Sequence, residues 1–227
     1  MNSALGSVRP AVSVSLANVV MEKVRDLISE GKLEPGDQVT ETALADAFGV
    51  SRGPAREAMK KLTQEGLLRY ERSRGTYVKE LTPADVLDVY RVRGAIECAA
   101  LDVLIDRGDE SVFDALEAIV EDLEAAARSE NWPESDRLDL HFHSTLVKRS
   151  ESPRLITIFE TLQLETRMCL RILRFHHPDH PEIADWHRRI VDALRESDRA
   201  EARQALLDHN VTVLDDLLVR KEDKKEK

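Results

Sequence analysis

The segment from Thr40 to Gly66 constrains the fold most, because it predicts two short helices separated by a single tight turn. The first helix, in "TETALADAFGV", has apolar residues at helical spacing and ends at Gly49, a residue type that favours the left-handed C-cap conformation. Ser51 begins the second helix, which runs to about Glu65. Two helices joined in this way indicate a helix-turn-helix unit, whose second helix enters the major groove of DNA.

The charge distribution agrees with that prediction. The chain has a formal net charge of −10, yet residues 51–79 contain eight basic and three acidic residues. Arg52 and Arg56 lie one turn apart at the start of the second helix, where a guanidinium group can bind a guanine or phosphates. Taken alone, such a basic stretch is equally compatible with an ordinary solvated helix face.

A hairpin follows the second helix. The stretch "LLRYERSRGTYVKE" reads as a strand, a turn at Ser73-Arg74-Gly75 and a second strand. Such a hairpin is the wing of a winged helix, with Arg74 near the minor groove and Gly75 allowing close approach to a backbone.

The rest of the chain predicts helices only. We expect a flexible arm over 1–15, a winged helix over 16–80, an all-α six-helix bundle over 81–221 and a charged tail over 222–227. The bundle helices are expected at about 82–107, 109–129, 133–150, 153–175, 180–196 and 198–220. Thr82, Pro83 and Asp85 form the N-cap signature of the first of these. The predicted fold class is therefore mostly α.

Composition narrows the class of protein. No apolar run approaches the roughly 18 residues of a membrane helix, and the start lacks a signal-peptide pattern. Cys98 and Cys169 share no motif spacing, which argues against a disulfide framework. We therefore expect a cytoplasmic protein with no membrane partner.

Four polar residues of the predicted bundle have spacings that suit a metal. Asp139 and His143 are one turn apart and share a helical face. His187 and His209 lie about 11 residues before and after the Ser197-Asp198 turn, roughly 16 Å away along each helix. If these two helices pack antiparallel, one carboxylate and three imidazoles can bind a divalent transition metal. On this pattern alone, ordinary core or surface histidines remain the commoner explanation.

The first eighty residues resemble a known family. "GKLEPGDQVTETALADAFGVSRGPAREAMKKLTQEGLLRYERSRGTYV" is similar to the winged helix of the GntR family of bacterial transcription regulators. Gly53 departs from the pattern, since the family usually carries threonine at that position. The resemblance implies that six residues contact DNA: Ser51, Arg52, Gly53, Arg56, Arg74 and Gly75.

The second part resembles the ligand-binding FCD domain of the FadR subfamily, in the shorter, VanR-like layout with six helices. "LDLHFHSTLVKRSESPRL", "WHRRIVDALRESDRAEARQALLDHN" and "DVYRVRGAIE" carry the likeness. The resemblance implies that a metal is bound by Asp139, His143, His187 and His209. Zinc is the first choice of metal, with nickel, iron and manganese as alternatives.

Arg93 and Glu97 interrupt an otherwise apolar stripe. They form either an ordinary surface pair or a buried pair that binds the carboxylate of a small effector. The resemblance favours the second interpretation, with both residues in the effector site.

Together these features predict a homodimeric repressor that binds a palindromic operator in double-stranded DNA and is controlled by a small organic acid. One alternative is a metal-dependent hydrolase or lyase, for which Glu97 is the one candidate general base. A second alternative is a regulator that senses the metal itself.

Overall fold

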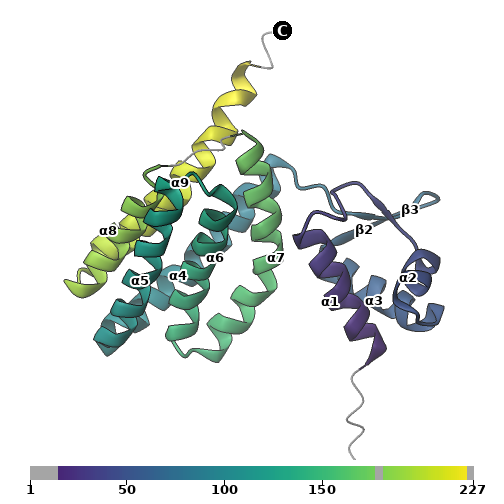
Figure 1. The fold of residues 1–227 in the computed structure, drawn as a ribbon, viewed down its shortest axis with the longest axis horizontal. Coiled ribbons are helices and arrows are strands. Elements are labelled where there is room, and N and C mark those ends of the chain that lie inside the picture. The colour runs from purple at the N-terminus through teal and green to yellow at the C-terminus, as the bar shows by residue number, and fades with distance from the viewer. Residues whose placement is uncertain (1–14, 177–180, 224–227) are drawn as a thin grey trace, which may run out of the picture. The chain divides into compact units, whose positions relative to one another are not determined.

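The computed structural model describes residues 15–176 and 181–223, and side chains within 15–170 and 181–211. Apart from Ser15, the arm predicted for residues 1–15 lies outside the described residues. So does the tail predicted for 222–227, apart from its first two residues. The chain divides into two compact units, residues 1–80 and residues 81–227 (Figure 1).

Over residues 15–80, the first unit combines three helices with a small antiparallel sheet. Its elements are α1 (Leu16–Ser29), β1 (Gln38–Val39), α2 (Glu41–Phe48), α3 (Arg52–Gln64), β2 (Leu68–Glu71) and β3 (Gly75–Val78). The sheet order is β1-β3-β2, with β3 paired to both neighbours. Apolar residues at helical spacing on α1 and α3 form the buried core of this unit: Val20, Val24, Ile28, Ala55, Ala58 and Leu62.

Local signals explain the helix pair. The Thr40 hydroxyl accepts a hydrogen bond from the Ala43 N–H (3.1 Å) and so caps α2. Gly49 ends α2 with φ of +63°, in the left-handed conformation expected from the sequence. Ser51 occupies the N-cap position of α3, but its side chain makes no capping hydrogen bond.

Strand β1 is the element that the sequence did not predict. It contains only two residues and forms by pairing Gln38 with Tyr77 and Val39 with Thr76. Two residues are too few to show an alternating pattern, and the partner strand lies almost forty residues further along the chain.

The second unit contains helices α4 (Pro83–Arg107), α5 (Glu110–Arg128), α6 (Trp132–Arg149), α7 (Pro153–His176), α8 (Ile183–Arg195) and α9 (Arg199–Asp223). No strand occurs among its described residues, so the prediction of a mostly α fold is confirmed. The predicted capping box starts α4, because Thr82 Oγ1 accepts from Asp85 N (3.2 Å) and Asp85 Oδ2 accepts from Thr82 N (2.8 Å).

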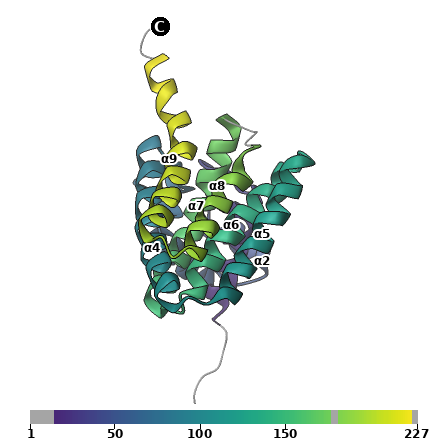
Figure 2. The same cartoon turned by 90° about the vertical axis from the view of Figure 1, so that its left-hand side faces the viewer.

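Helix α4 packs against α6, α7 and α9, while α8 packs against α5 and α9. Figure 2 shows these helices side by side. Their apolar faces form one core centred on Leu101, Leu116, Phe142, Ile190 and Leu206. Because of this packing, Arg93 and Glu97 of α4 are buried among the neighbouring helices. Across the residues that the structure describes, no helix has the length and apolar character needed to span a membrane.

Candidate metal centre and DNA-binding surface

The structure brings together the four residues that the spacing singled out. Helix α6 contributes Asp139 and His143, α8 contributes His187 and α9 contributes His209. All four are buried, and one ligand atom from each lies within 4.8 Å of the others. The rings of His187 and His209 have centroids 4.5 Å apart, so the α8–α9 packing sets these two residues level with each other.

The distances within the cluster suit a small metal ion. The Nε2 atom of His143 lies 3.2 Å from Nε2 of His209 and 3.3 Å from Nε2 of His187. Asp139 Oδ1 lies 3.2 Å from His187 Nε2 and 3.6 Å from the Nε2 atoms of the other two histidines. Tetrahedral ligands at bond lengths of about 2.0–2.1 Å are spaced by about 3.3–3.4 Å. The donor set therefore fits a zinc-sized ion.

Hydrogen bonding outside the cluster indicates where the imidazole protons lie. His187 Nδ1 donates to the carbonyl oxygen of Ile183 (2.7 Å), because a carbonyl can only accept. The lone pair of His187 Nε2 therefore faces the cluster. His143 Nδ1 lies 3.2 Å from Glu97 Oε1, in poor alignment for a hydrogen bond, and an ionised carboxylate favours a proton on that nitrogen too.

The acceptor nitrogens of His143 and His187 and the carboxylate oxygen Oδ1 of Asp139 thus face one another at 3.2–3.6 Å. Lone pairs this close repel each other, and a cation between them removes the repulsion.

The charges around the cluster are consistent with metal binding. Burial by itself would raise the pKa of Asp139, but the three neighbouring imidazoles hold it well below its usual range. Burial and the neighbouring His187 lower the pKa of His209 to about 3. Burial and Arg93 also act to lower the pKa of His143, but Glu97 and Asp139 outweigh them and raise it. An ionised carboxylate and neutral imidazoles are the forms that bind metals, so a metal competes with a proton at His143.

Arg93 and Glu97 form a buried pair and not a surface pair. Their side chains are 1% and 0% exposed, and Arg93 Nε donates to Glu97 Oε1 at 2.7 Å. Burial acts to raise the pKa of Glu97, but the Arg93 guanidinium and His143 lower it to about 2. The same Oε1 atom approaches His143, so Glu97 links Arg93 to the metal-binding cluster.

Several polar atoms next to this pair lack a hydrogen-bond partner among the residues that the structure describes. Arg93 Nη2, Glu97 Oε2 and Asp139 Oδ2 are buried and unpaired. Buried polar groups in folded proteins are nearly always paired, with protein, water or ligand. The arrangement therefore has open hydrogen-bonding capacity beside a potential metal site.

Two further residues with unpaired atoms were missed by the sequence reasoning, Tyr90 and Asn210. Both are buried, and burial raises the pKa of Tyr90, so its hydroxyl stays protonated and can donate. Their signal in the sequence is positional. Tyr90 shares the helical stripe of Arg93 and Glu97, and Asn210 lies one turn beyond the fully buried Leu206.

The predicted DNA-contacting residues of α3 lie on its exposed N-terminal turns. Ser51, Arg52 and Gly53 are exposed. The Arg56 side chain is 70% exposed, and its Nε and Nη2 donate to the two carboxylate oxygens of Glu41 at 2.8 and 3.0 Å. Glu41, on α2, is a further residue that the sequence reasoning missed. It holds the guanidinium of Arg56 in one orientation.

The wing forms as predicted between β2 and β3. Arg74, 73% exposed, pairs with Glu71 at 3.0 Å and lies against the Tyr77 ring. Gly75 has φ of +116°, and an added Cβ would lie 2.8 Å from Gln38 Nε2. Because Gln38 Nε2 also donates to the Arg74 carbonyl (2.9 Å), glycine is required at this tip.

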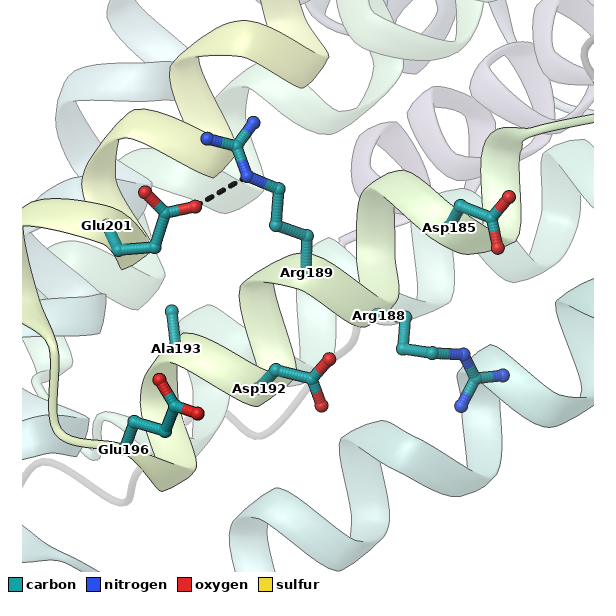
Figure 3. Close-up of a pocket in the computed structure, with 7 residues that line it drawn as sticks. All are labelled: Asp185, Arg188, Arg189, Asp192, Ala193, Glu196 and Glu201. Carbon is teal, nitrogen blue, oxygen red and sulfur yellow. Dashed lines mark hydrogen bonds and ion pairs between the residues drawn. The ribbon is translucent and has the colours of Figure 1, made fainter.

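A groove of about 290 Å³ crosses α8 and the start of α9 (Figure 3). Arg189 reaches from α8 to Glu201 on α9 (2.5 Å), whereas Arg188 points away and pairs with Glu117 and Glu124 on α5. The arginines of this groove therefore join neighbouring helices.

Comparison with known proteins identifies both units. Residues 16–78 match the model of "Bacterial regulatory proteins, gntR family", and residues 88–212 match that of the FCD domain. The uncharacterised HTH-type transcriptional regulator YdhC of Bacillus subtilis is 34% identical over 82% of this chain and 84% of its own length. The gluconate operon transcriptional repressor of the same species is 29% identical over 82% and 79%. The crystal structure of a putative GntR regulator from Rhodococcus sp. RHA1 covers 88% of this chain and 98% of its own, with 27% identity and a TM-score of 0.71. This chain therefore belongs to the gntR family of bacterial transcription regulators, in the group that carries an FCD domain.

Proposed function

We propose that the chain is a cytoplasmic transcription repressor whose operator affinity is controlled by a small carboxylate bound at a metal-containing site. Residues 16–80 bind DNA, and residues 81–221 bind the metal and the effector. The observation that carries this proposal is a buried cluster of acceptor atoms. His187 Nε2 lies 3.3 Å from His143 Nε2 and 3.2 Å from Asp139 Oδ1, and the latter two atoms are 3.6 Å apart. Such a cluster calls for a cation.

Asp139, His143, His187 and His209 would hold the ion, and three imidazoles with one carboxylate favour zinc, with nickel, iron or manganese as alternatives. A bound divalent ion supplies positive charge that attracts an oxygen ligand of an organic acid. Glu97 Oε1 lies 3.2 Å from His143 Nδ1, and its negative charge would favour a proton on that nitrogen, the role that carboxylates commonly have behind metal-binding histidines.

Arg93 supplies the second attraction for an acid. Its Nε is used by Glu97, but its buried Nη2 remains unpaired and can donate to an effector carboxylate. Glu97 would not itself contact that carboxylate, since two like charges repel. Its role in the effector site is to orient Arg93.

On the DNA side, Arg52 and Arg56 would contact base edges or phosphates in the major groove, with Ser51 and Gly53 allowing close approach at the start of α3. Arg74 and Gly75 would enter the minor groove at the wing tip. A single winged helix buries little surface, so specific binding requires a homodimer on a palindromic operator.

Control follows from linkage between the two sites. An effector alters operator affinity only if it binds two conformations of the dimer with different affinity. Among relatives, one is named a gluconate operon repressor, and gluconate is a carboxylate. This supports testing sugar acids as effectors.

A hydrolase or lyase is less well supported by the same geometry. The one candidate base, Glu97, is bound to Arg93 and has a pKa of about 2, far from the near-neutral value that suits a general base. We propose that the metal serves binding and not catalysis.

The test is a fluorescence-anisotropy titration of the full chain with DNA from its own promoter region, at two salt concentrations. The zinc-loaded protein should bind specifically and weaken steeply with salt, and one acid of a carboxylate panel should shift the affinity. Replacing His187 or His209 with alanine should abolish that shift. A response to zinc alone, with no effect of any acid, would instead favour a metal sensor, and absence of specific DNA binding would contradict the proposal.

A further inference from the structure

Asn210 is a buried polar residue in which, within the part of the chain that the structure describes, both side-chain hydrogen-bonding atoms lack a partner. Its side chain is 4% exposed, and neither Oδ1 nor Nδ2 has a hydrogen-bond partner among the described residues. An amide has donor and acceptor capacity, and burying both unpaired is unfavourable. The amide is therefore open to pair with water or with a bound ligand.

The Asn210 amide packs against α4 next to the residues of the proposed site. On one side it contacts α4, since a Cβ added to Gly94 would lie 3.1 Å from Asn210 Nδ2. Gly94 directly follows Arg93. On the other side, Asn210 directly follows His209 of the metal cluster. The glycine leaves room for the amide next to the arginine.

Tyr90 adds a second unpaired group on the same stripe of α4. Tyr90, Arg93 and Glu97 are spaced by three and four residues, so they share one helical face. The Arg93 Cζ atom lies 5.2 Å from the centre of the Tyr90 ring, and the Tyr90 hydroxyl is buried without a partner. Besides the charged acceptor Glu97 Oε2, the unpaired groups along α4 and α9 thus include donors and an uncharged amide acceptor, Asn210 Oδ1.

That acceptor restricts the chemistry of the ligand. A carboxylate accepts hydrogen bonds and donates none, so it can satisfy Arg93 Nη2 and Asn210 Nδ2 but not Asn210 Oδ1. An ammonium group would donate, but it would lie close to the Arg93 guanidinium and to a metal cation. A hydroxyl group donates and accepts without charge, and so matches the amide.

We propose that Asn210, assisted by Tyr90, binds a hydroxyl group of the effector, so that the pocket selects hydroxycarboxylates over plain carboxylates. This inference rests on the proposed carboxylate site and deepens it. Arg93 and the metal would bind the acid, and Asn210 would distinguish hydroxylated from unsubstituted members of the class.

The test is isothermal titration of the zinc-loaded full chain with two matched pairs of acids, lactate with propionate and gluconate with hexanoate. In at least one pair, the hydroxylated acid should bind about tenfold tighter or more, because a site built for a hydroxyl leaves polar groups unpaired when the hydroxyl is missing. Asn210→Leu should bring that ratio close to one and leave the affinity for the plain acid within about threefold, because only the hydroxyl contact is lost. Arg93→Met is the matched control, and it should weaken both members of a pair together.

A ligand-free measurement separates this role from a structural one. Without acid, Asn210→Leu should not lower the melting temperature of the zinc-loaded protein, because leucine has similar volume and removes an unpaired buried amide. A clear loss of stability would mean that the amide is paired inside the protein, and would overturn the inference.

The remaining outcomes are also distinguishable. If the preference for the hydroxylated acid persists in Asn210→Leu, the metal and not Asn210 binds the hydroxyl group. The inference then fails, while the proposed function stands. If the zinc-loaded wild-type protein binds none of the four acids, both the inference and the carboxylate-effector part of the proposed function are overturned.

Discussion

The two units use charged residues in opposite ways. In the first unit, the arginines expected to bind DNA are exposed, and Arg56 and Arg74 pair with surface carboxylates. In the second unit, Arg93, Glu97 and Asp139 are almost completely buried. Exposed ion pairs exchange readily with water, whereas a buried charge needs a nearly complete set of partners. The first arrangement suits a partner bound through many phosphates, and the second suits one small ligand.

The largest effect that separates the units is expected from Glu97→Leu. Removing one member of a buried ion pair leaves the other charge uncompensated, so the free energy of unfolding of the second unit should fall by about 3–5 kcal/mol. Both tryptophans, Trp132 and Trp186, lie in this unit, so urea unfolding followed by tryptophan fluorescence reports on it selectively. Glu97→Gln, which keeps the volume and one acceptor, should cost less. An unchanged unfolding midpoint for Glu97→Leu would show that Arg93 does not depend on this carboxylate.

Metal removal should have the next largest effect. An ion that binds only the folded state at about a hundred times its dissociation constant adds about 3 kcal/mol of stability. Adding a chelator should therefore lower the fluorescence-detected melting temperature, and zinc should restore it. The His187→Ala variant is the matched control and should respond to neither reagent. Equal responses of the variant and the wild type would contradict a metal site at this cluster.

In the first unit, substitutions should change DNA affinity and leave stability nearly unaffected. Arg52→Ala and Arg56→Ala should each weaken operator binding by about tenfold and reduce its salt dependence, since each removes a positive contact to DNA. Anisotropy titrations at several salt concentrations measure both quantities. Lys32→Ala, a change at an exposed lysine paired with Glu30 and outside α3 and the wing, serves as a comparison and should leave the affinity unchanged. If the arginine variants also unfold more easily, their role is structural.

The smallest effect is expected from Glu41→Gln. This change removes the charged partner of an exposed Arg56, so the stability of the protein should not change measurably. Operator affinity should rise slightly, because Arg56 no longer has to break an ion pair with Glu41 in order to contact DNA. The same titration measures the change. A clear loss of affinity would mean that Glu41 orients Arg56 for binding and does not compete with DNA.

Much of the fold could be predicted because its signals are local. The caps at Thr82 and Gly49, the punctuation between helices and the apolar stripes act over one or two turns, and the helix boundaries agree with the structure to within about three residues. Strand β1 could not be predicted, because it exists only through its pairing with β3. Asp139 and His143 were placed together by helical spacing, and His187 and His209 by equal distances from one turn.

What the sequence determined by itself was therefore the helices and the β2–β3 hairpin, the basic start of α3 and the four candidate metal ligands. Only the tertiary structure decided that Arg93 and Glu97 are buried, that one Glu97 oxygen reaches both Arg93 and His143, and that Asn210 has no partner among the described residues. The physical reason is the distance along the sequence over which each kind of interaction acts. Helix formation depends on residues three or four positions apart, whereas burial and hydrogen-bond pairing depend on how α4, α6 and α9 pack together.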